Sequence, residues 1–308
     1  MRIPILLFAA AGLLSGPLVA QALSPRIAGI QSGLATHTDF RFTEVDYPGA
    51  LETYLFGENN LGLTTGAFQD SGQNPHAFIL KDGAFQALDS DGVLGQNPSY
   101  ALTCNDMGVV VGQWTSPDRS VSHGFTWQHG QVITVDYPDS SFSAVYGIND
   151  LGTLIGTWTD SNSATQGYIC HHGRFAPLTG PGITSIVPYS INLHETIVGQ
   201  LLSTADHQYH AFIRTPGGHY TLFDAPGAAA GSTVAISVNN QGLILGYYAL
   251  ADGSYHGFLK MGETYVPLDY PGTTTTVTQT LNDFSRIVGF FVDGEGNSHG
   301  FTAVPDLF

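Results

Sequence analysis

Apolar and polar residues alternate over short stretches of this chain, and tight turns interrupt the alternation. Residues 143–148 and 153–158 are two such stretches, and the turn Asn149-Asp150-Leu151-Gly152 separates them. An alternation with a period of about two residues predicts β-strands with one buried face. Residues 167–171 and 174–178 continue the pattern as a third and a fourth strand. The pattern therefore predicts a unit of four short antiparallel strands, with no helical period.

The four-stranded unit occurs six times. Its turn motif, Asn-Asp-x-Gly-x-x-x-Gly-x-aromatic, returns about every 43 to 47 residues. A unit of this length cannot bury both faces unless neighbouring units stack on it. The sequence therefore predicts an all-β fold, a six-bladed β-propeller of four-stranded antiparallel blades. A two-sheet sandwich is the alternative, but it gives no reason for six equal repeats. The last glycine of the motif falls at Gly66, Gly112, Gly156, Gly199, Gly246 and Gly289.

The ends of the repeat region predict how the ring closes. The sixth unit stops after its third strand, at residues 299–302, and an extra fourth-strand segment precedes the first unit. We expect this segment, residues 40–47, to join the C-terminal blade, because the pairing removes an open sheet edge. The propeller then spans residues 40–308.

The first residues have the pattern of a secretory signal. Arg2 precedes an apolar run over residues 3–14, and residues 20–22 form a small-x-small cleavage site. The run is short for a bilayer span, which needs about 20 residues, and no basic stop-transfer cluster follows it. We expect a signal peptide at 1–22, a linker at 23–39, and a secreted or periplasmic mature protein without membrane insertion.

The charge balance narrows the class of partner. The chain has 25 acidic and 9 basic residues, which gives a net charge of −16. Nucleic acid is excluded as a partner, because phosphate neutralisation needs clustered lysine and arginine. We expect a monomer. Cys104 and Cys170 fall far apart in the repeat pattern, which favours two separate buried thiols over a disulfide bond.

A histidine opens the third strand in five units. Hairpin register places each histidine opposite an aspartate on the fourth strand, because the turn fixes which residues face each other. In the third unit Gln166 and Thr179 replace both members. This joint change favours structural hydrogen-bonded pairs over a catalytic or metal site, since active sites are rarely repeated around a whole ring. The pairs are His76 with Asp89, His123 with Asp136, His210 with Asp224, His256 with Asp269, and His299 with Asp46.

The repeated motifs resemble those of the HAF family of extracellular repeat proteins of bacteria. The triplets His76-Ala77-Phe78 and His210-Ala211-Phe212 carry the likeness, together with the Asn-Asp-x-Gly turns. The likeness covers roughly residues 40 to 308 and implies export and a repeat fold. It supplies no catalytic residues. The third unit departs with Gln166-Gly167-Tyr168, and the fourth has Leu193-His194-Glu195 in place of Asp-x-Gly.

Candidate ligand sites are expected on the face that carries the loops between second and third strands. Tyr47, Tyr137 and Tyr270 follow strand-end residues there, and aromatic rings beside neutral polar groups suit sugars. A tyrosine at the same place in three blades, within a good turn sequence, nevertheless favours a packing role, and sugar binding is the alternative. The loop with Asp293, Glu295 and Asn297 offers oxygen ligands at alternate positions, which a calcium ion could use, but it is too short for an EF-hand loop and lacks the late bidentate glutamate, which favours a plain solvated turn. Calcium is the alternative for this loop.

The sequence predicts binding rather than catalysis. It contains no Gly-x-Ser-x-Gly, His-Glu-x-x-His or phosphate-loop motif, and no cofactor is expected. The leading hypothesis is a non-enzymatic propeller that binds a glycan or a protein at the cell surface. The alternative is a glycoside hydrolase or polysaccharide lyase, because paired carboxylates can come from distant blades.

Overall fold

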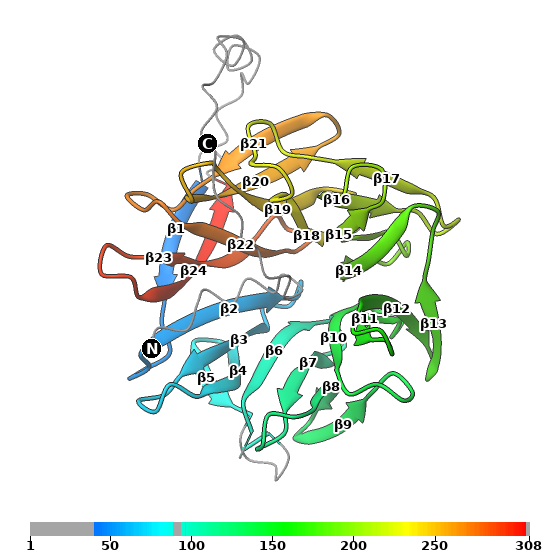
Figure 1. Ribbon diagram of the computed structural model, residues 1–308. Helices are drawn as coiled ribbons and strands as arrows, with labels where there is room; N and C mark the ends of the chain where they lie inside the picture. The colour runs from blue at the N-terminus through cyan, green and yellow to red at the C-terminus, as the bar shows by residue number, and fades with distance from the viewer. Residues whose placement is uncertain (1–39, 89–93, 96, 306–308) are drawn as a thin grey trace. The chain divides into compact units, whose positions relative to one another are not determined.

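The computed structural model describes residues 40–88, 94, 95 and 97–305, and in these residues every regular element is a β-strand. The strands form six antiparallel sheets of four strands each, which Figure 1 shows as successive blades. The chain is a six-bladed β-propeller, and the predicted fold class is confirmed.

Blades 1 to 3 follow each other in chain order, and each runs from its innermost to its outermost strand. Blade 1 comprises β2 (Glu52–Glu58), β3 (Thr64–Gln69), β4 (Pro75–Lys81) and β5 (Ala84–Ala87). Blade 2 comprises β6 (Ser99–Cys104), β7 (Val110–Thr115), β8 (Ser122–Gln128) and β9 (Gln131–Val135). Blade 3 comprises β10 (Ser143–Ile148), β11 (Leu154–Thr159), β12 (Thr165–His171) and β13 (Arg174–Leu178).

Blades 4 and 5 repeat this order, and blade 6 takes its outer strand from the N-terminal side. Blade 4 comprises β14 (Ile183–Ile191), β15 (Ile197–Ser203), β16 (Tyr209–Arg214) and β17 (Tyr220–Phe223). Blade 5 comprises β18 (Val234–Val238), β19 (Ile244–Ala249), β20 (Tyr255–Met261) and β21 (Thr264–Leu268). Blade 6 comprises β22 (Thr276–Leu281), β23 (Ile287–Val292), β24 (Ser298–Pro305) and β1 (Phe40–Val45).

The ring closes as predicted. β1 lies antiparallel to β24, with Phe40 opposite Pro305 and Val45 opposite Gly300 (Figure 1). The sixth blade is therefore built from both ends of the repeat region. This pairing leaves no blade with an unfilled position that would weaken the ring.

The six innermost strands contact one another in sequence, from β2 through β6, β10, β14 and β18 to β22, and β22 contacts β2. Each of them carries a register shift at the same place, as between Ala101 and Thr103 in β6. The facing glycine of the second strand fits this bulge because it has no side chain. At Gly112, an added Cβ would overlap the carbonyl oxygen of Tyr100. The bulge therefore explains the last glycine of the turn motif.

Each junction between neighbouring blades holds an apolar cluster. Between blades 3 and 4, for example, Ile155, Ile186 and Ile197 are fully buried against Phe212. The phenylalanine of the His-Gly/Ala-Phe triplet belongs to this core in five blades, and Tyr168 takes its place in blade 3. The triplet thus places an aromatic ring in the core and its histidine two positions away, on the same face of the strand, near the loops.

The described residues contain no helix that is long and apolar enough to cross a membrane. The predicted signal peptide and linker lie outside the described residues. Cys104 and Cys170 are both buried, free thiols, as the sequence favours. Cys104 lies in the cluster between blades 1 and 2.

Candidate functional site

Six asparagines form a closed hydrogen-bonded ring around the propeller axis. Each begins the turn after an innermost strand, is buried, and donates its Nδ2 to the backbone oxygen of the equivalent asparagine in the next blade, at 2.8 to 3.3 Å. The bond from Asn282 to Asn59 closes the circle across 223 residues of sequence. We call this set the asparagine ring: Asn59, Asn105, Asn149, Asn192, Asn239 and Asn282.

The other end of each amide is also engaged. The Oδ1 of Asn149 accepts hydrogen bonds from the backbone nitrogens of Leu151 at 3.1 Å and Thr153 at 3.0 Å, within its own turn. The side chain therefore fixes the local turn and joins two blades at once. Such buried amides are costly to leave unpaired, so the ring is a structural element.

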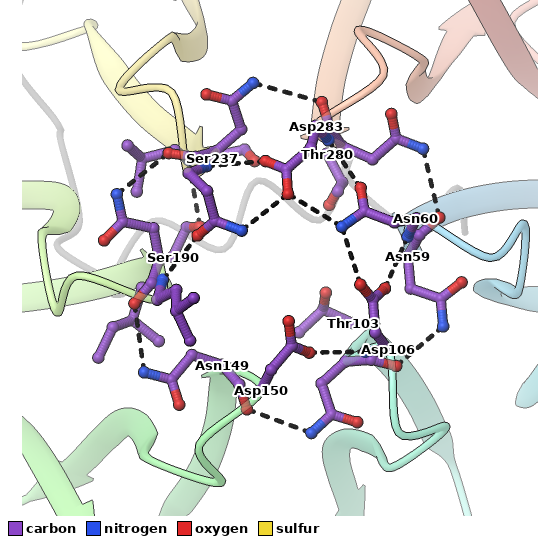
Figure 2. Close-up of a pocket in the computed structure, with 18 of the residues that line it drawn as sticks. Asn59, Asn60, Thr103, Asp106, Asn149, Asp150, Ser190, Ser237, Thr280 and Asp283 are labelled. Atoms are coloured by element: carbon purple, nitrogen blue, oxygen red, sulfur yellow. Dashed lines mark hydrogen bonds between the residues drawn. The ribbon is translucent and has the colours of Figure 1, made fainter.

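The next residue in each turn forms a second ring, which we call the rim: Asn60, Asp106, Asp150, Leu193, Asn240 and Asp283. Backbone nitrogens of the rim donate to Oδ1 atoms of the next blade's rim residue, as from Asp106 to Asp150 at 2.8 Å. Four further contacts of this kind, at 2.7 to 2.8 Å, repeat around the axis (Figure 2). Leu193 offers no acceptor, so the rim is interrupted at blade 4.

A pocket of about 90 Å³ opens on the axis, and both rings line it together with hydroxyl groups from the ends of the innermost strands (Figure 2). Ser190, Ser237 and Thr280 are among these hydroxyl-bearing residues. The hydroxyl of Ser237 accepts a hydrogen bond from the backbone nitrogen of Leu281 in the next blade. The mouth of the pocket is therefore a ring of amide, carboxylate and hydroxyl groups.

Carboxylates converge at this mouth. The Nδ2 of Asn60 donates to both Asp106 and Asp283, at 2.9 Å each, so the two acids lie side by side. A converging pair of acids is what a glycosidase needs. Both acids, however, also accept backbone N–H groups, Asp106 from Asn60 and Asp283 from Asn240, at 2.8 Å each. These contacts hold the carboxylates as fixed acceptors.

Glu58 is a buried acid beneath the rim. Burial raises the pKa of its carboxyl, and the nearby Arg286 opposes that rise. The Nε of Arg286 lies 2.8 Å from Oε1, and the hydroxyl of Thr64 donates to Oε2 at 3.1 Å. The side chain is only 1% exposed. Because both oxygens are engaged and covered, Glu58 lacks the access to a ligand that a general acid requires.

Exposed apolar side chains surround part of the rim. They occupy the tips of the same turns, and they are 62% to 74% exposed. We call them the apolar crescent: Leu61, Met107, Leu151 and Phe284. The tips of blades 4 and 5 carry His194 and Gln241 instead. Exposed apolar side chains at four of the six turns beside a polar pocket make this face a candidate binding surface.

The predicted histidine pairs lie at the other face of the propeller. The Nδ1 atoms contact the expected aspartates at 2.7 Å in His123–Asp136, 2.8 Å in His210–Asp224, 3.1 Å in His256–Asp269 and 2.7 Å in His299–Asp46. Asp89, the expected partner of His76, lies outside the described residues. Gln166 contacts Asp160 at 3.2 Å, and Thr179 is exposed.

In several blades a second acid, from the loop before the third strand, contacts the other nitrogen of the histidine side chain. The Nε2 of His210 lies 2.9 Å from Asp206, that of His299 3.3 Å from Asp293, and that of His76 3.2 Å from Asp70. Burial opposes protonation of His210, but its hydrogen bonds to Asp206 and Asp224 outweigh this, so its pKa lies above its ordinary value. Imidazole clamped between two acids is therefore favoured in its charged form.

The calcium candidate is a self-capped turn. The Oδ1 of Asp293 accepts the backbone nitrogens of Glu295 and Asn297 at 2.8 Å each, and these bonds lower the pKa of Asp293. Asp70 and Asp160 cap the corresponding turns of other blades in the same way. A turn common to several blades favours a plain solvated loop.

Acidic and histidine donors of the described residues also converge at the blade closure. Donor atoms of Glu44, Asp46 and His299 lie within 4.8 Å of one another. The Nδ1 of His299 is already paired with Asp46 at 2.7 Å. This cluster is therefore the last of the histidine pairs, with one additional exposed acid beside it.

The three candidate tyrosines lie in connections between blades, and each packs on the blade that follows it. Tyr47 stacks on Phe68, with ring centroids 3.8 Å apart, Tyr137 on Trp158 at 4.1 Å and Tyr270 on Phe291 at 3.7 Å. Each ring also meets the core aromatic of the third strand, as Tyr137 meets Tyr168. One face of each tyrosine is thus covered, and no open platform for a sugar remains on that side.

Sequence reasoning sought the ligand site on the histidine face, whereas the axial pocket described here opens on the opposite face. The missed residues are those of the rim and the crescent. Their signal was present, because the turn motif brings an asparagine to the same position in all six units. His172 and His194, also on this face, do not form a shared cluster with other donors among the described residues.

Comparisons with known proteins support the fold. No protein-family model matches the chain, and no curated protein is similar to it in sequence. Among solved structures, the Aleuria aurantia lectin in complex with Fucα1-6GlcNAc is 13% identical with a TM-score of 0.54, covering 82% of this chain and 91% of the lectin. That lectin is described elsewhere as a six-bladed β-propeller with a novel mode of fucose recognition.

Two further structures show the same likeness. SapL1 lectin in complex with α-methyl fucoside is 10% identical with a TM-score of 0.53, covering 83% of this chain and 96% of that lectin. TolB from Acinetobacter baumannii is 9% identical with a TM-score of 0.55, covering 83% of this chain and 65% of TolB. The TM-scores show a shared architecture. The identities are too low to transfer a ligand, which has to be argued from the residues.

Proposed function

We propose that this protein is a non-enzymatic, carbohydrate-binding β-propeller that acts outside the cytoplasm and binds neutral glycans on its axial face. The observation that carries the proposal is the polar rim at the pocket mouth, with the apolar crescent beside it. Sugars present hydroxyl groups at their edges and apolar C–H faces, so they suit fixed acceptors next to apolar side chains.

The charge of the site selects among glycans. Asp106, Asp150 and Asp283 bring three carboxylates to the rim, and Arg286 is held by Glu58. Anionic sugars would be repelled by these acids and by the net charge of −16. Neutral glycans meet no such penalty. Phe284, 74% exposed and next to Asp283, supplies an aromatic surface for stacking.

Several observations support binding over turnover. The rim acids are held by backbone N–H groups, and Glu58, the acid with a raised pKa, is covered and paired. The likeness to propeller lectins supports binding as well. The expected signal peptide and the resemblance to HAF repeat proteins support a location outside the cytoplasm. A carbohydrate-active enzyme remains the second candidate, because Asp106 and Asp283 converge.

A glycan array followed by calorimetry tests the proposal. We expect neutral glycans among the hits and acidic ones absent. Phe284→Ala should weaken a hit about tenfold or more, as loss of an aromatic anchor does. Leu222→Ala removes an exposed apolar side chain from β17, away from the axis, and should leave the affinity unchanged. No glycan binding would overturn the proposal, and release of reducing ends from a hit would establish the enzyme alternative.

A further inference from the structure

The rim is complete at five of its six positions. Among the described residues, the backbone N–H of Asp150 takes no acceptor, because Leu193 stands where the other blades place an aspartate or asparagine. Asp150 and Leu193 both line the axial pocket (Figure 2 labels Asp150). A donor without an acceptor at a pocket mouth costs free energy unless water or a ligand satisfies it.

The gap is not caused by a displaced turn. Leu193 donates its own backbone nitrogen to Asn240 at 2.7 Å, as the other rim residues do to their neighbours. Asn192 keeps its place in the asparagine ring, donating to Asn239 at 3.0 Å. The turn of blade 4 therefore has the common geometry and lacks only the side-chain acceptor.

Blade 4 keeps this turn at a conformational cost. Glu195 adopts a φ of 57°, at the position where Gly152 has a φ of 77° in blade 3. A left-handed conformation disfavours a residue with a side chain, so the turn is maintained despite the loss of glycine. Ser285 adopts a φ of 61° at the same position of blade 6, where the rim is complete, so the gap in blade 4 follows from Leu193 alone.

We propose that the gap is a ligand subsite, in which a hydroxyl group of a neutral sugar completes the rim. The hydroxyl oxygen accepts the Asp150 N–H, and its proton is donated to Oδ2 of Asp150, which no described residue engages; Oδ1 accepts from Asp106. A hydroxyl group is suited to this pair because it accepts and donates at once. A ligand carboxylate would bring a second negative charge against Asp150.

In this subsite the side chain of Leu193 contacts the ligand, whereas the other rim side chains accept a hydrogen bond from the preceding blade. Its side chain is 38% exposed at the pocket mouth, and that of Leu151, at the tip of the neighbouring turn, is 62% exposed. The C–H face of a sugar ring packs against such apolar groups while its hydroxyl groups reach polar ones. This subsite rests on the proposed function, and it specifies where on the axial face the sugar is oriented.

Leu193→Asn is the direct test, because it restores the missing acceptor. We expect the variant to melt at the same temperature as the wild type or higher, and to bind the glycan hit about tenfold more weakly or worse. Leu222→Asn makes the same change at an exposed position of β17, away from the axis, so its affinity should equal that of the wild type. A folded Leu193→Asn variant with unchanged affinity would overturn the subsite and leave the proposed function standing.

A second measurement needs no variant. In ¹⁵N-edited NMR spectra of the wild type, the same glycan should shift the Asp150 amide and slow its exchange with solvent. Asn60 and Asp106 donate their amides to protein acceptors already, and we expect smaller changes there. An unchanged Asp150 amide in a saturated complex would overturn the subsite. If the wild type binds no glycan at all, the proposed function itself fails.

Discussion

Two sets of polar side chains repeat around this propeller, and they differ in what they join. The asparagine ring lies buried at the axis and links each blade to the next. The histidine pairs lie at the opposite face, partly exposed, and link strands and a loop within one blade. Repetition alone would suggest that both sets stabilise the fold equally. The asparagines, however, are buried and join different blades, so we expect them to contribute more to the free energy of unfolding than the histidines do.

The comparison also separates structure from binding. The asparagine side chains are engaged at both ends, and so are the histidine rings that contact two acids. The rim and the crescent are different, because they expose acceptors and apolar surface beside the pocket. A ligand site is therefore expected where a repeated position leaves groups free, as at blade 4.

The largest effect should come from the asparagine ring. Asn149→Ala removes the bond to Asn192 and the acceptor of two turn N–H groups, so we expect a loss of about 3 kcal/mol in the free energy of unfolding. Urea unfolding measures it. Leu151→Ala, at the tip of the same turn, is the control and should change stability by less than about 0.5 kcal/mol. A loss at Asn149 below about 1 kcal/mol would remove the distinction between the two sets.

A smaller effect should come from a histidine pair. His210→Gln should cost less than about 1 kcal/mol, because the partners Asp206 and Asp224 are 47% and 45% exposed and solvent screens the pair. Urea unfolding at pH 6 measures this cost. Equal losses for His210→Gln and Asn149→Ala would contradict the comparison.

The cost of His210→Gln should depend on pH. The pKa of His210 is raised in the folded protein. Its contribution to the free energy of unfolding is therefore fully present below its unfolded pKa of about 6.5, and it is lost as the pH rises through the folded pKa. The hydrogen bond from His210 lowers the pKa of Asp206. The contribution of Asp206 to the free energy of unfolding is therefore lost as the pH falls below about 4. Wild type and variant should differ most between about pH 4 and 6.5 and converge as the pH rises above the raised pKa of His210. A constant difference would show that the pair is not charged.

Much of the architecture could be predicted from local patterns. Alternation and the turn motif predicted four strands per blade, and hairpin register placed His123 opposite Asp136, because facing positions depend only on the intervening turn. The pairing of residues 40–45 with 300–305 followed from a missing strand in the last unit. These features need no knowledge of how blades are oriented.

The candidate site could not be predicted in the same way. The bond from Asn149 to Asn192 joins residues 43 positions apart, and it depends on how the blades curve around the axis. Asp206 approaches His210 only because a loop folds back over the strand. Tyr137 was a candidate platform because the sequence does not show that Trp158, on β11 of the following blade, stacks on its ring.

Hydrogen–deuterium exchange of the wild type, with and without a bound neutral oligosaccharide, tests the central claim most directly. The account predicts slower exchange in the axial turns, above all at residues 149–152 and 282–285. It predicts no change in the loops of the histidine face, at residues 203–209 and 292–298. Protection confined to those loops, with the axial turns unaffected, would contradict the assignment of binding to the axial face.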